Sequence, residues 1–169
     1  RASHAVKDTV TTFGGSALMN RVGHAFFKKR MREENAAFGG EVTGHYYFRK
    51  NFFADNGFIP ALLILELMSI KAMTLKQLLS PLRQRYFISG EINTEMPDMN
   101  AVESTIERIK NAYKGGRTYE MDGVSVEYPT WHFNVRPSNT EPLIRLNLES
   151  NSQTSMERRR DEVLALIRI

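Results

Sequence analysis

Residues 118–128 read TYEMDGVSVEY, and this stretch decides the fold class of the second half of the chain. Strand-forming residues stand on both sides of Asp122-Gly123. An Asp-Gly pair takes the positive φ angles that a two-residue hairpin turn requires. Working outward from this hairpin, we predict further strands at residues 86–95, 131–135 and 143–148. The second half is therefore expected to form an antiparallel sheet.

Two helices complete the predicted second half. Asp98 is a typical N-cap for a helix that stops at Gly115-Gly116. Thr154 and Glu157 match a capping box for a last helix. The order strand, helix, four strands, helix favours a small α+β domain with the helices packed on an antiparallel sheet.

The first half of the chain predicts a partial α/β domain, with a mixed sheet and helices. Helices are expected around residues 6–13, 24–32, 57–72 and 74–79, and short strands at residues 17–19 and 46–48. Asp55 or Asn56 is expected to cap the long third helix. Ser80-Pro81 predicts the end of the fourth helix, because a residue before proline avoids the helical conformation.

A linker and hinge at residues 82–86 is expected to separate two domains, residues 1–81 and 87–169. The charge distribution supports this division. Residues 1–85 carry 13 Lys and Arg against 6 Asp and Glu, whereas residues 86–169 carry 10 against 13. The whole excess of positive charge therefore belongs to the first half.

Composition excludes several classes of protein. With 169 residues, 41% of them hydrophobic, the chain fits one or two small globular domains and not a disordered chain. The absence of Cys excludes disulfides, thiol nucleophiles and thiolate metal sites. The longest apolar run, residues 58–68, is far shorter than the roughly 20 residues that span a bilayer. Because the chain begins with Arg1 instead of Met, we expect a fragment or a processed piece.

The segment RPSNTEP, residues 136–142, is the strongest candidate for anion binding. Together with the Arg at position 145 it offers two guanidinium groups, two hydroxyls and a carboxamide within ten positions. Its two prolines are expected to keep it out of a regular ladder. A concave turn would then point backbone N–H groups at an anion. An ordinary inter-strand loop whose polar residues satisfy its own backbone explains the pattern equally well.

The segment GGEVTGH, residues 39–45, is a candidate for sugar binding. Its glycines let the backbone approach a ligand closely. Glu41, Thr43 and His45 add an acceptor, a hydroxyl and an imidazole, which suit the hydroxyls of a polyol. On the residues alone, an ordinary β-turn with a solvated Glu41 is the simpler interpretation. His24, at the start of a basic helix, is by itself more typical of a structural or exposed histidine.

A nucleic-acid-binding module is an alternative function from a different class. The net charge is +4, and residues 28–32 give one helix a basic face. The aromatic run at residues 46–53 is similar to a stacking platform for single strands. Adjacent residues of a strand point to opposite sides, however, so at least part of this run is expected in the core.

Taken together, the two candidate loops resemble those of the α-D-phosphohexomutases. Residues 40–45 are similar to the sugar-recognition loop of that family, and residues 136–142 to its C-terminal phosphate-binding loop. Asn139 points to the phosphomannomutase/phosphoglucomutase branch, and Thr43 replaces the usual Ser. The resemblance covers almost the whole chain. It implies the later part of the third domain before the linker, and the complete fourth domain, of TATA-binding-protein-like fold, after it.

The resemblance also implies a role for each candidate residue. A phosphate grip is implied for Arg136, Ser138, Asn139, Thr140 and Arg145. Sugar binding is implied for Glu41, Thr43 and His45, with His24 matching a substrate-facing histidine and Arg1 matching a basic residue at a strand end.

The resemblance implies a cytoplasmic isomerase that interconverts hexose 6-phosphate and hexose 1-phosphate. The reaction would use a phosphoserine, a hexose 1,6-bisphosphate intermediate and Mg²⁺. Neither the catalytic serine loop nor the Asp-rich magnesium loop of the family matches any stretch of this sequence. We therefore assign no catalytic or metal-binding residue, and expect the fragment not to catalyse phosphoryl transfer alone.

The resemblance implies two partners, a phosphosugar and the remaining domains of the same enzyme. It implies no nucleic acid and no membrane. A catalytically inactive regulatory relative stays open as a further alternative.

Overall fold

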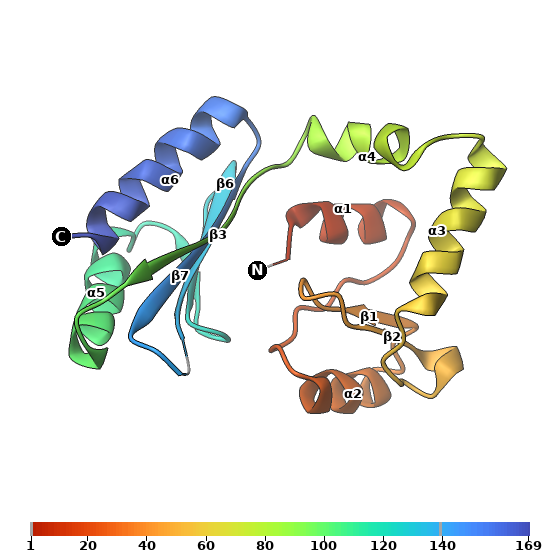
Figure 1. Ribbon diagram of the computed structural model, residues 1–169, viewed down its shortest axis with the longest axis horizontal. Coiled ribbons are helices and arrows are strands. Elements are labelled where there is room, and N and C mark those ends of the chain that lie inside the picture. The colour runs from red at the N-terminus through yellow and green to blue at the C-terminus, as the bar shows by residue number, and fades with distance from the viewer. Residues whose placement is uncertain (1, 139) are drawn as a thin grey trace. The chain divides into compact units, whose positions relative to one another are not determined.

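The computed structural model describes residues 2–138 and 140–169. They form two compact units, Ala2–Arg83 and Gln84–Ile169, called here the first and the second unit. Each unit combines helices with a sheet (Figure 1). The predicted class, a mixed α/β part followed by an α+β part, is confirmed. Arg1 and Asn139, two of the predicted site residues, lie outside the described residues.

The first unit pairs two short strands and surrounds them with helices. Its elements in order are α1 (His4–Thr12), α2 (His24–Glu33), β1 (Phe38–Gly40), β2 (Tyr46–Phe48), the short 3₁₀ helix η1 (Arg49–Asn51), α3 (Phe58–Lys71) and α4 (Leu75–Arg83). Strands β1 and β2 are antiparallel, with Gly40 opposite Tyr46. The side chain of Asn56 caps α3, because its Oδ1 accepts the N–H groups of Phe58 and Ile59.

The sheet of the first unit is smaller than the mixed sheet that we expected. Residues 17–19 are not a strand, and among the described residues of this unit only β1 and β2 pair. A three-residue apolar run gains little from an extended conformation unless a neighbouring strand supplies the ladder of hydrogen bonds. Leu18 and Met19 are accordingly exposed.

The predicted helix stop at Ser80-Pro81 is wrong. Helix α4 continues through Pro81 to Arg83, so the first two residues of the predicted linker are helical. Proline removes one intrahelical N–H donor and orphans the carbonyl of the residue four positions earlier. That residue is Gln77, which is exposed, so water can satisfy its carbonyl. Near the end of an exposed helix, proline is therefore tolerated.

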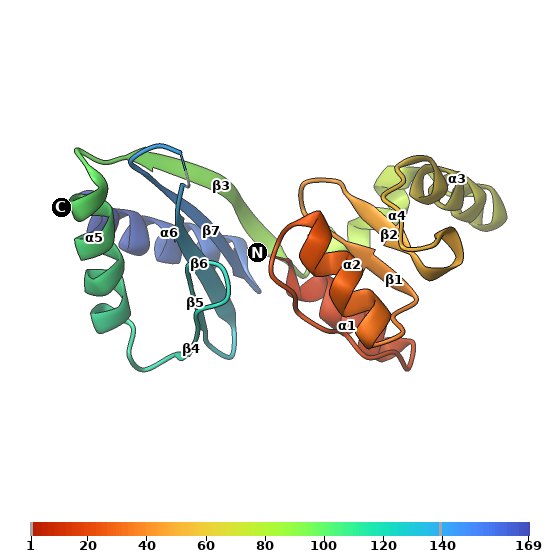
Figure 2. The same cartoon turned by 90° about the horizontal axis from the view of Figure 1, so that it is seen from below.

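The second unit is a five-stranded antiparallel sheet with two helices. Its elements in order are β3 (Phe87–Glu95), α5 (Met99–Ala112), β4 (Arg117–Tyr119), β5 (Val124–Glu127), β6 (Trp131–Pro137), β7 (Leu143–Ser150) and α6 (Gln153–Ile167). The strand order is β3-β7-β6-β5-β4, which places the first strand beside the last (Figure 2). This sequence of elements is the predicted one.

Alternation along the two central strands separates a core face from a polar face. The core face carries Trp131, Phe133 and Val135 of β6 and Ile144, Leu146 and Leu148 of β7, all buried. They pack against buried residues of α5 and α6, among them Val102, Ile109, Val163 and Ile167. Apart from Leu143, the alternate residues of the two strands are polar and belong to the other face. The largest continuous core of the described residues therefore fixes the position of a polar sheet face.

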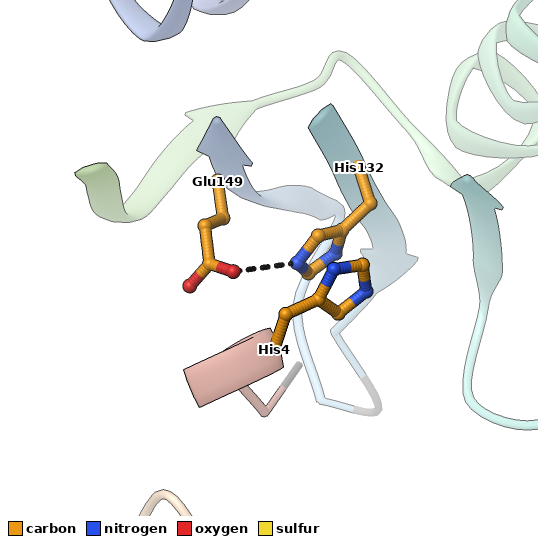
Figure 3. A group of neighbouring side chains, drawn as sticks. All are labelled: His4, His132 and Glu149. Carbon is orange, nitrogen blue, oxygen red and sulfur yellow. Dashed lines mark hydrogen bonds and ion pairs between the residues drawn. The ribbon is translucent and has the colours of Figure 1, made fainter. Parts of the chain in front are cut away.

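His132 and Glu149 illustrate the polar face. They are direct partners across β6 and β7. The Nε2 of His132 lies 3.2 Å from the Oε1 of Glu149, as the dashed line in Figure 3 marks. Glu149 is buried, and this cross-strand pair gives one oxygen of its carboxylate a partner that reduces the cost of burial.

Two local predictions in the second unit need correction. Tyr119 pairs with Ser125, so the hairpin loop is longer than two residues, and only Gly123 of the Asp-Gly pair has a positive φ. The cap of α6 is Ser152, whose Oγ accepts the N–H of Ser155, and not Thr154. The turn of the hairpin lies where we expected it, but the register of β4 and β5 makes the loop longer, and α6 begins two residues earlier than the predicted cap.

Helix α3 is mostly apolar, with Glu66 and Lys71 as its charged residues, and none of its residues is buried. Within the described parts of the chain, no single helix is both long and apolar enough to cross a membrane. Helices α3 and α4 meet that criterion only as a pair, with a bend of 94° between them.

The core of the second unit should govern its stability. Phe133 is completely buried, so Phe133→Ala should destabilise this unit by about 3–5 kcal/mol, because it removes apolar burial and leaves a cavity. Chemical denaturation, followed by the fluorescence of Trp131, measures the change. Ile88→Ala is the matched control, because Ile88 lies on β3 and is 62% exposed. Equal losses in the two variants would contradict the assignment of the core.

Candidate functional site

The hairpin of β1 and β2 presents the predicted sugar-binding segment. The N–H of Glu41 donates to the carbonyl of His45, and the N–H of Gly44 donates to the carbonyl of Glu41. These bonds close a tight turn with Thr43 exposed at its tip. Gly39 serves packing here, since a Cβ at this position would lie 2.7 Å from the Sδ of Met31. The hairpin thus rests closely on α2 and holds the turn in place.

The Glu41 carboxylate is fixed by two donors from different elements. Its Oε2 accepts the N–H of Gly23, which precedes α2, at 3.1 Å. Its Oε1 accepts the hydroxyl of Tyr47 at 2.6 Å. The Tyr47 side chain is 0% exposed and stacks on Phe27. Burial, and next the hydrogen bond to Glu41, raise the pKa of Tyr47, so the phenol stays protonated and remains a donor.

Two histidines lie beside this carboxylate. The hydroxyl of Tyr47 is 3.0 Å from the Nδ1 of His24, the first residue of α2. Because the hydroxyl gives its one hydrogen to Glu41, His24 must donate from Nδ1 to the Tyr47 oxygen. The rings of His24 and His45 are in edge contact, with centroids 4.3 Å apart. The turn and the start of α2 therefore present two imidazoles side by side.

Asp55 anchors the second imidazole. Its Oδ2 lies 2.7 Å from the Nδ1 of His45, and its Oδ1 accepts the N–H of Tyr46 at 3.0 Å. The hydrogen bond from His45 lowers the pKa of Asp55, burial opposes this change, and the Tyr46 N–H adds to it. Asp55 is therefore an ionised carboxylate that orients His45, not the cap of α3.

The first candidate cluster is therefore only partly the predicted one. The structure brings His24, Glu41 and His45 together, through the side chains of Tyr47 and Asp55. Thr43 lies on the same turn but faces solvent at its tip.

The predicted phosphate-binding segment begins inside a strand. Arg136 pairs with Arg145, and Pro137 with Ile144, so the expectation that prolines exclude this segment from the ladder is wrong at these positions. The N–H of Ser138 donates to the carbonyl of Leu143, which makes residues 137 and 144 a pair without ladder hydrogen bonds. Proline is accepted there because β7 requires no donor from it.

Arg136 and Arg145 are direct cross-strand neighbours on the polar face, and the carboxylate of Glu91 lies between them. The Nη2 of Arg136 is 3.4 Å from Oε2, and the Nη1 of Arg145 is 3.1 Å from Oε1. Asn147 donates to the same carboxylate. Burial raises the pKa of Glu91, but the Asn147 hydrogen bond and the charges of both arginines outweigh it and lower the pKa below its usual 4.5.

A β-bulge aims Glu91 at the arginines. The register between β3 and β7 shifts between Ile88 and Glu91, where Gly90 has a φ of 71°. The Oγ of Ser89 accepts the N–H of Leu148 and so replaces a ladder acceptor. A bulge with glycine in the left-handed region turns the following side chain without breaking the strand.

Ser138 and Thr140 complete the described part of the phosphate-binding segment. The Ser138 side chain is buried, and its hydroxyl lies 3.4 Å from that of Thr140. The N–H of Thr140 also points at the Ser138 oxygen, at 3.4 Å. The structure therefore places two hydroxyls together directly after Arg136 on the chain.

The sequence did not identify Tyr47, Asp55 or Glu91 as members of these clusters. A glycine within a strand pattern is a bulge signal, so Ser89-Gly90 pointed to a special position at Glu91. Tyr47 and Asp55 carry no comparable local signal. Each acts through residues of other segments, between 6 and 23 positions away along the chain, and only the fold brings them together.

Family models match both parts of the chain. The model described as "Phosphoglucomutase/phosphomannomutase, alpha/beta/alpha domain III" matches residues 1–86. The model described as "Phosphoglucomutase/phosphomannomutase, C-terminal domain" matches residues 91–166.

Curated relatives agree with these models. A phosphomannomutase of Escherichia coli is 44% identical over 164 residues and covers 95% of this chain. A phosphomannomutase of Methanocaldococcus jannaschii is 36% identical and covers 99%. The chain spans about a third of the length of these relatives, 35% and 36% respectively.

A solved structure shares the fold. A phosphoglucomutase/phosphomannomutase family protein of Burkholderia thailandensis matches 98% of this chain with a TM-score of 0.78 and 26% identity. The match covers 35% of that protein.

The Asp55–His45 pair gives a test of the first cluster. His45→Gln should raise the pKa of Asp55 toward its usual 3.8, because the variant removes the largest cause of its lowering. A lowered carboxyl pKa stabilises the fold above the unfolded pKa, and this stability is lost as the pH falls through the folded value. Carboxyl NMR titration measures the pKa. The pKa of Asp161, which pairs with Arg160 in the second unit, should not change in this variant. An unchanged pKa of Asp55 would contradict the Asp55–His45 pair.

Proposed function

The chain belongs to the phosphoglucomutase/phosphomannomutase family, and we propose that it supplies sugar and phosphate recognition to a phosphohexomutase. The whole enzyme would interconvert hexose 6-phosphate and hexose 1-phosphate through a phosphoserine and a hexose 1,6-bisphosphate. The observation that carries the proposal is the convergence of Arg136 and Arg145 on one carboxylate. A site that holds a carboxylate between two guanidinium groups has the donors that a phosphate needs.

In the second unit, Arg136 and Arg145 would bind the phosphate that is not being transferred. Their planar guanidinium groups suit the oxygens of a phosphate dianion. The hydroxyls of Ser138 and Thr140 would add neutral donors, as would Asn139, which lies outside the described residues. Glu91 contacts both arginines and orients their guanidinium groups. Phosphate would then meet donors that are already oriented, which lowers the entropic cost of binding.

In the first unit, Glu41 would accept hydrogen bonds from ring hydroxyls of the sugar. Tyr47 and Gly23 occupy one lone pair on each carboxylate oxygen and thereby fix its direction. Each oxygen keeps a further acceptor site for a hydroxyl. Thr43, His24 and His45 would line the same subsite, with Arg1 as a further member. We infer no preference between glucose and mannose.

The family resemblance implies Mg²⁺, but the first-unit donor cluster does not fit it. Mg²⁺ takes oxygen ligands in a near-octahedral arrangement. His24, His45 and Asp55 offer two nitrogens and one carboxylate oxygen. We therefore assign Mg²⁺ to no residue of this chain and derive no step through it. What these residues would do in the reaction is bind and orient the phosphosugar.

Arg136→Ala tests the phosphate subsite. In the unaltered chain, inorganic phosphate should shift the amide NMR signals of residues 136–145. The variant should bind phosphate at least about tenfold more weakly, because a charge-assisted hydrogen bond contributes about 1.5–3 kcal/mol. Arg117→Ala is the matched control, because Arg117 lies on β4 of the same sheet, away from Glu91. If phosphate shifts none of these signals, the subsite is refuted.

Glu41→Gln tests the sugar subsite separately. Glucose 6-phosphate and mannose 6-phosphate should shift the signals of residues 39–45 in the unaltered chain. The variant should lose most of this response, because an amide offers one acceptor oxygen where the carboxylate offers two. Its response to inorganic phosphate at residues 136–145 should be unchanged. A sugar phosphate that shifts residues 39–45 equally in both proteins would exclude Glu41 as a sugar ligand.

A single-stranded oligonucleotide tests the alternative function in the same experiment. Specific binding to the first unit that weakens steeply with salt would support a nucleic-acid module and not a phosphosugar subsite.

A further inference from the structure

The first unit gathers three metal-ligating groups at one place. They come from the first residue of α2 (His24), the residue before β2 (His45) and the segment after η1 (Asp55). One donor atom from each lies within 4.8 Å of the others. The Oδ2 of Asp55 is 2.7 Å from the Nδ1 of His45 and 4.0 Å from the Nδ1 of His24. Two imidazoles therefore converge on one carboxylate oxygen.

These separations suit the coordination shell of a small ion. Zn²⁺ binds nitrogen and oxygen ligands at about 2.0–2.2 Å, which places neighbouring tetrahedral ligands about 3.3 Å apart. The two separations, 2.7 and 4.0 Å, bracket this value, so small side-chain rotations would bring all three donors to one centre. The side chains of His24 and His45 are 49% and 40% exposed, so solvent borders both rings and leaves room for such rotations.

Backbone contacts fix the Asp55 carboxylate on the side away from the histidines, as supporting contacts usually do for a metal ligand. The Oδ1 of Asp55 accepts the N–H of Tyr46, and Asp55 forms a β-bridge with Tyr47. Tyr47 is completely buried, so the backbone that carries Asp55 is fixed to the core of the unit. The other oxygen of Asp55, Oδ2, faces the two histidines. Such supporting bonds orient a ligand and increase its affinity for the metal.

The donor chemistry selects the class of ion. Imidazole nitrogens favour Zn²⁺, Co²⁺, Ni²⁺ and Cu²⁺, whereas Mg²⁺ and Ca²⁺ prefer oxygen. Two imidazoles and one carboxylate leave at least one coordination position for water or another ligand. We propose that His24, His45 and Asp55 form a binding site for one divalent transition ion, of which Zn²⁺ is the best fit.

Binding would replace contacts that the groups make now. Coordination through Nδ1 would displace the proton that His45 shares with Asp55 and the proton that His24 donates to Tyr47. These protons would leave to solvent, so affinity should fall as the pH falls. The same imidazoles belong to the proposed sugar subsite. An ion and a sugar would therefore compete, but ion binding can be measured without any sugar, and its outcome is independent of the proposed function.

Titration of the chain with Co²⁺ alone tests the site. We expect a saturable visible absorption band with a stoichiometry of one, and selective broadening of the imidazole NMR signals of His24 and His45. Zn²⁺ should abolish the band, and a large excess of Mg²⁺ should not. The absence of a saturable band, or broadening confined to other histidines, would overturn the proposal even without any variant.

Variants then assign the ligands. His45→Gln and Asp55→Asn should each weaken Co²⁺ binding by about tenfold or more. Asp55→Asn keeps an oxygen that can accept the Tyr46 N–H, so we expect the local fold to be retained. Far-UV circular dichroism measures whether the variant is folded. His132→Gln and Asp161→Asn are the matched controls in the second unit and should bind Co²⁺ as the unaltered chain does. Equal affinity in all four variants, or a loss only in the controls, would refute the assignment.

Discussion

The arrangement of the second unit depends on one carboxylate between two guanidinium groups. Arg136 and Arg145 are direct partners on neighbouring strands, a position where like charges repel. Glu91 compensates this repulsion from a third strand, β3, which pairs with β7 although the two are far apart in the sequence. The buried apolar face of the same strands fixes the spacing of all three groups. Core packing and charge compensation therefore act on the same three strands.

In the first unit, a carboxylate is oriented by neutral donors and not by cations. Glu41 is held by a phenol and a backbone N–H instead of a cation, so its negative charge is oriented without being neutralised. The phenol can do this because Tyr47 is buried and its pKa is raised. One unit thus presents positive charge oriented by a carboxylate, and the other presents a carboxylate oriented by neutral donors. These are the complementary requirements of phosphate and of sugar hydroxyls.

Local signals in the sequence predicted most elements. They failed where the conformation of a segment depends on a partner that is distant in the sequence. The Asp98 cap of α5 is a local signal, and the structure has it as predicted. Residues 17–19 needed a strand partner, and Pro137 needed a pairing register, neither of which a local pattern contains. The site followed the same rule. Arg136, Glu41 and the histidines carry recognisable chemistry. The role of Glu91 depends on arginines at least 45 residues away, and that of Tyr47 on its burial and on His24 and Glu41.

The bulge at Ser89-Gly90 also bears on how reliably β3 finds its place. Because side chains alternate along a strand, a slip of one residue would turn Glu91 toward the core and Ile92 toward water. Such a misregistered sheet would bury a charge away from both arginines and would forfeit the bond from Leu148 to Ser89. The bulge that directs Glu91 to the polar face therefore also destabilises the nearest wrong register of β3, both through the buried charge and through the lost hydrogen bond.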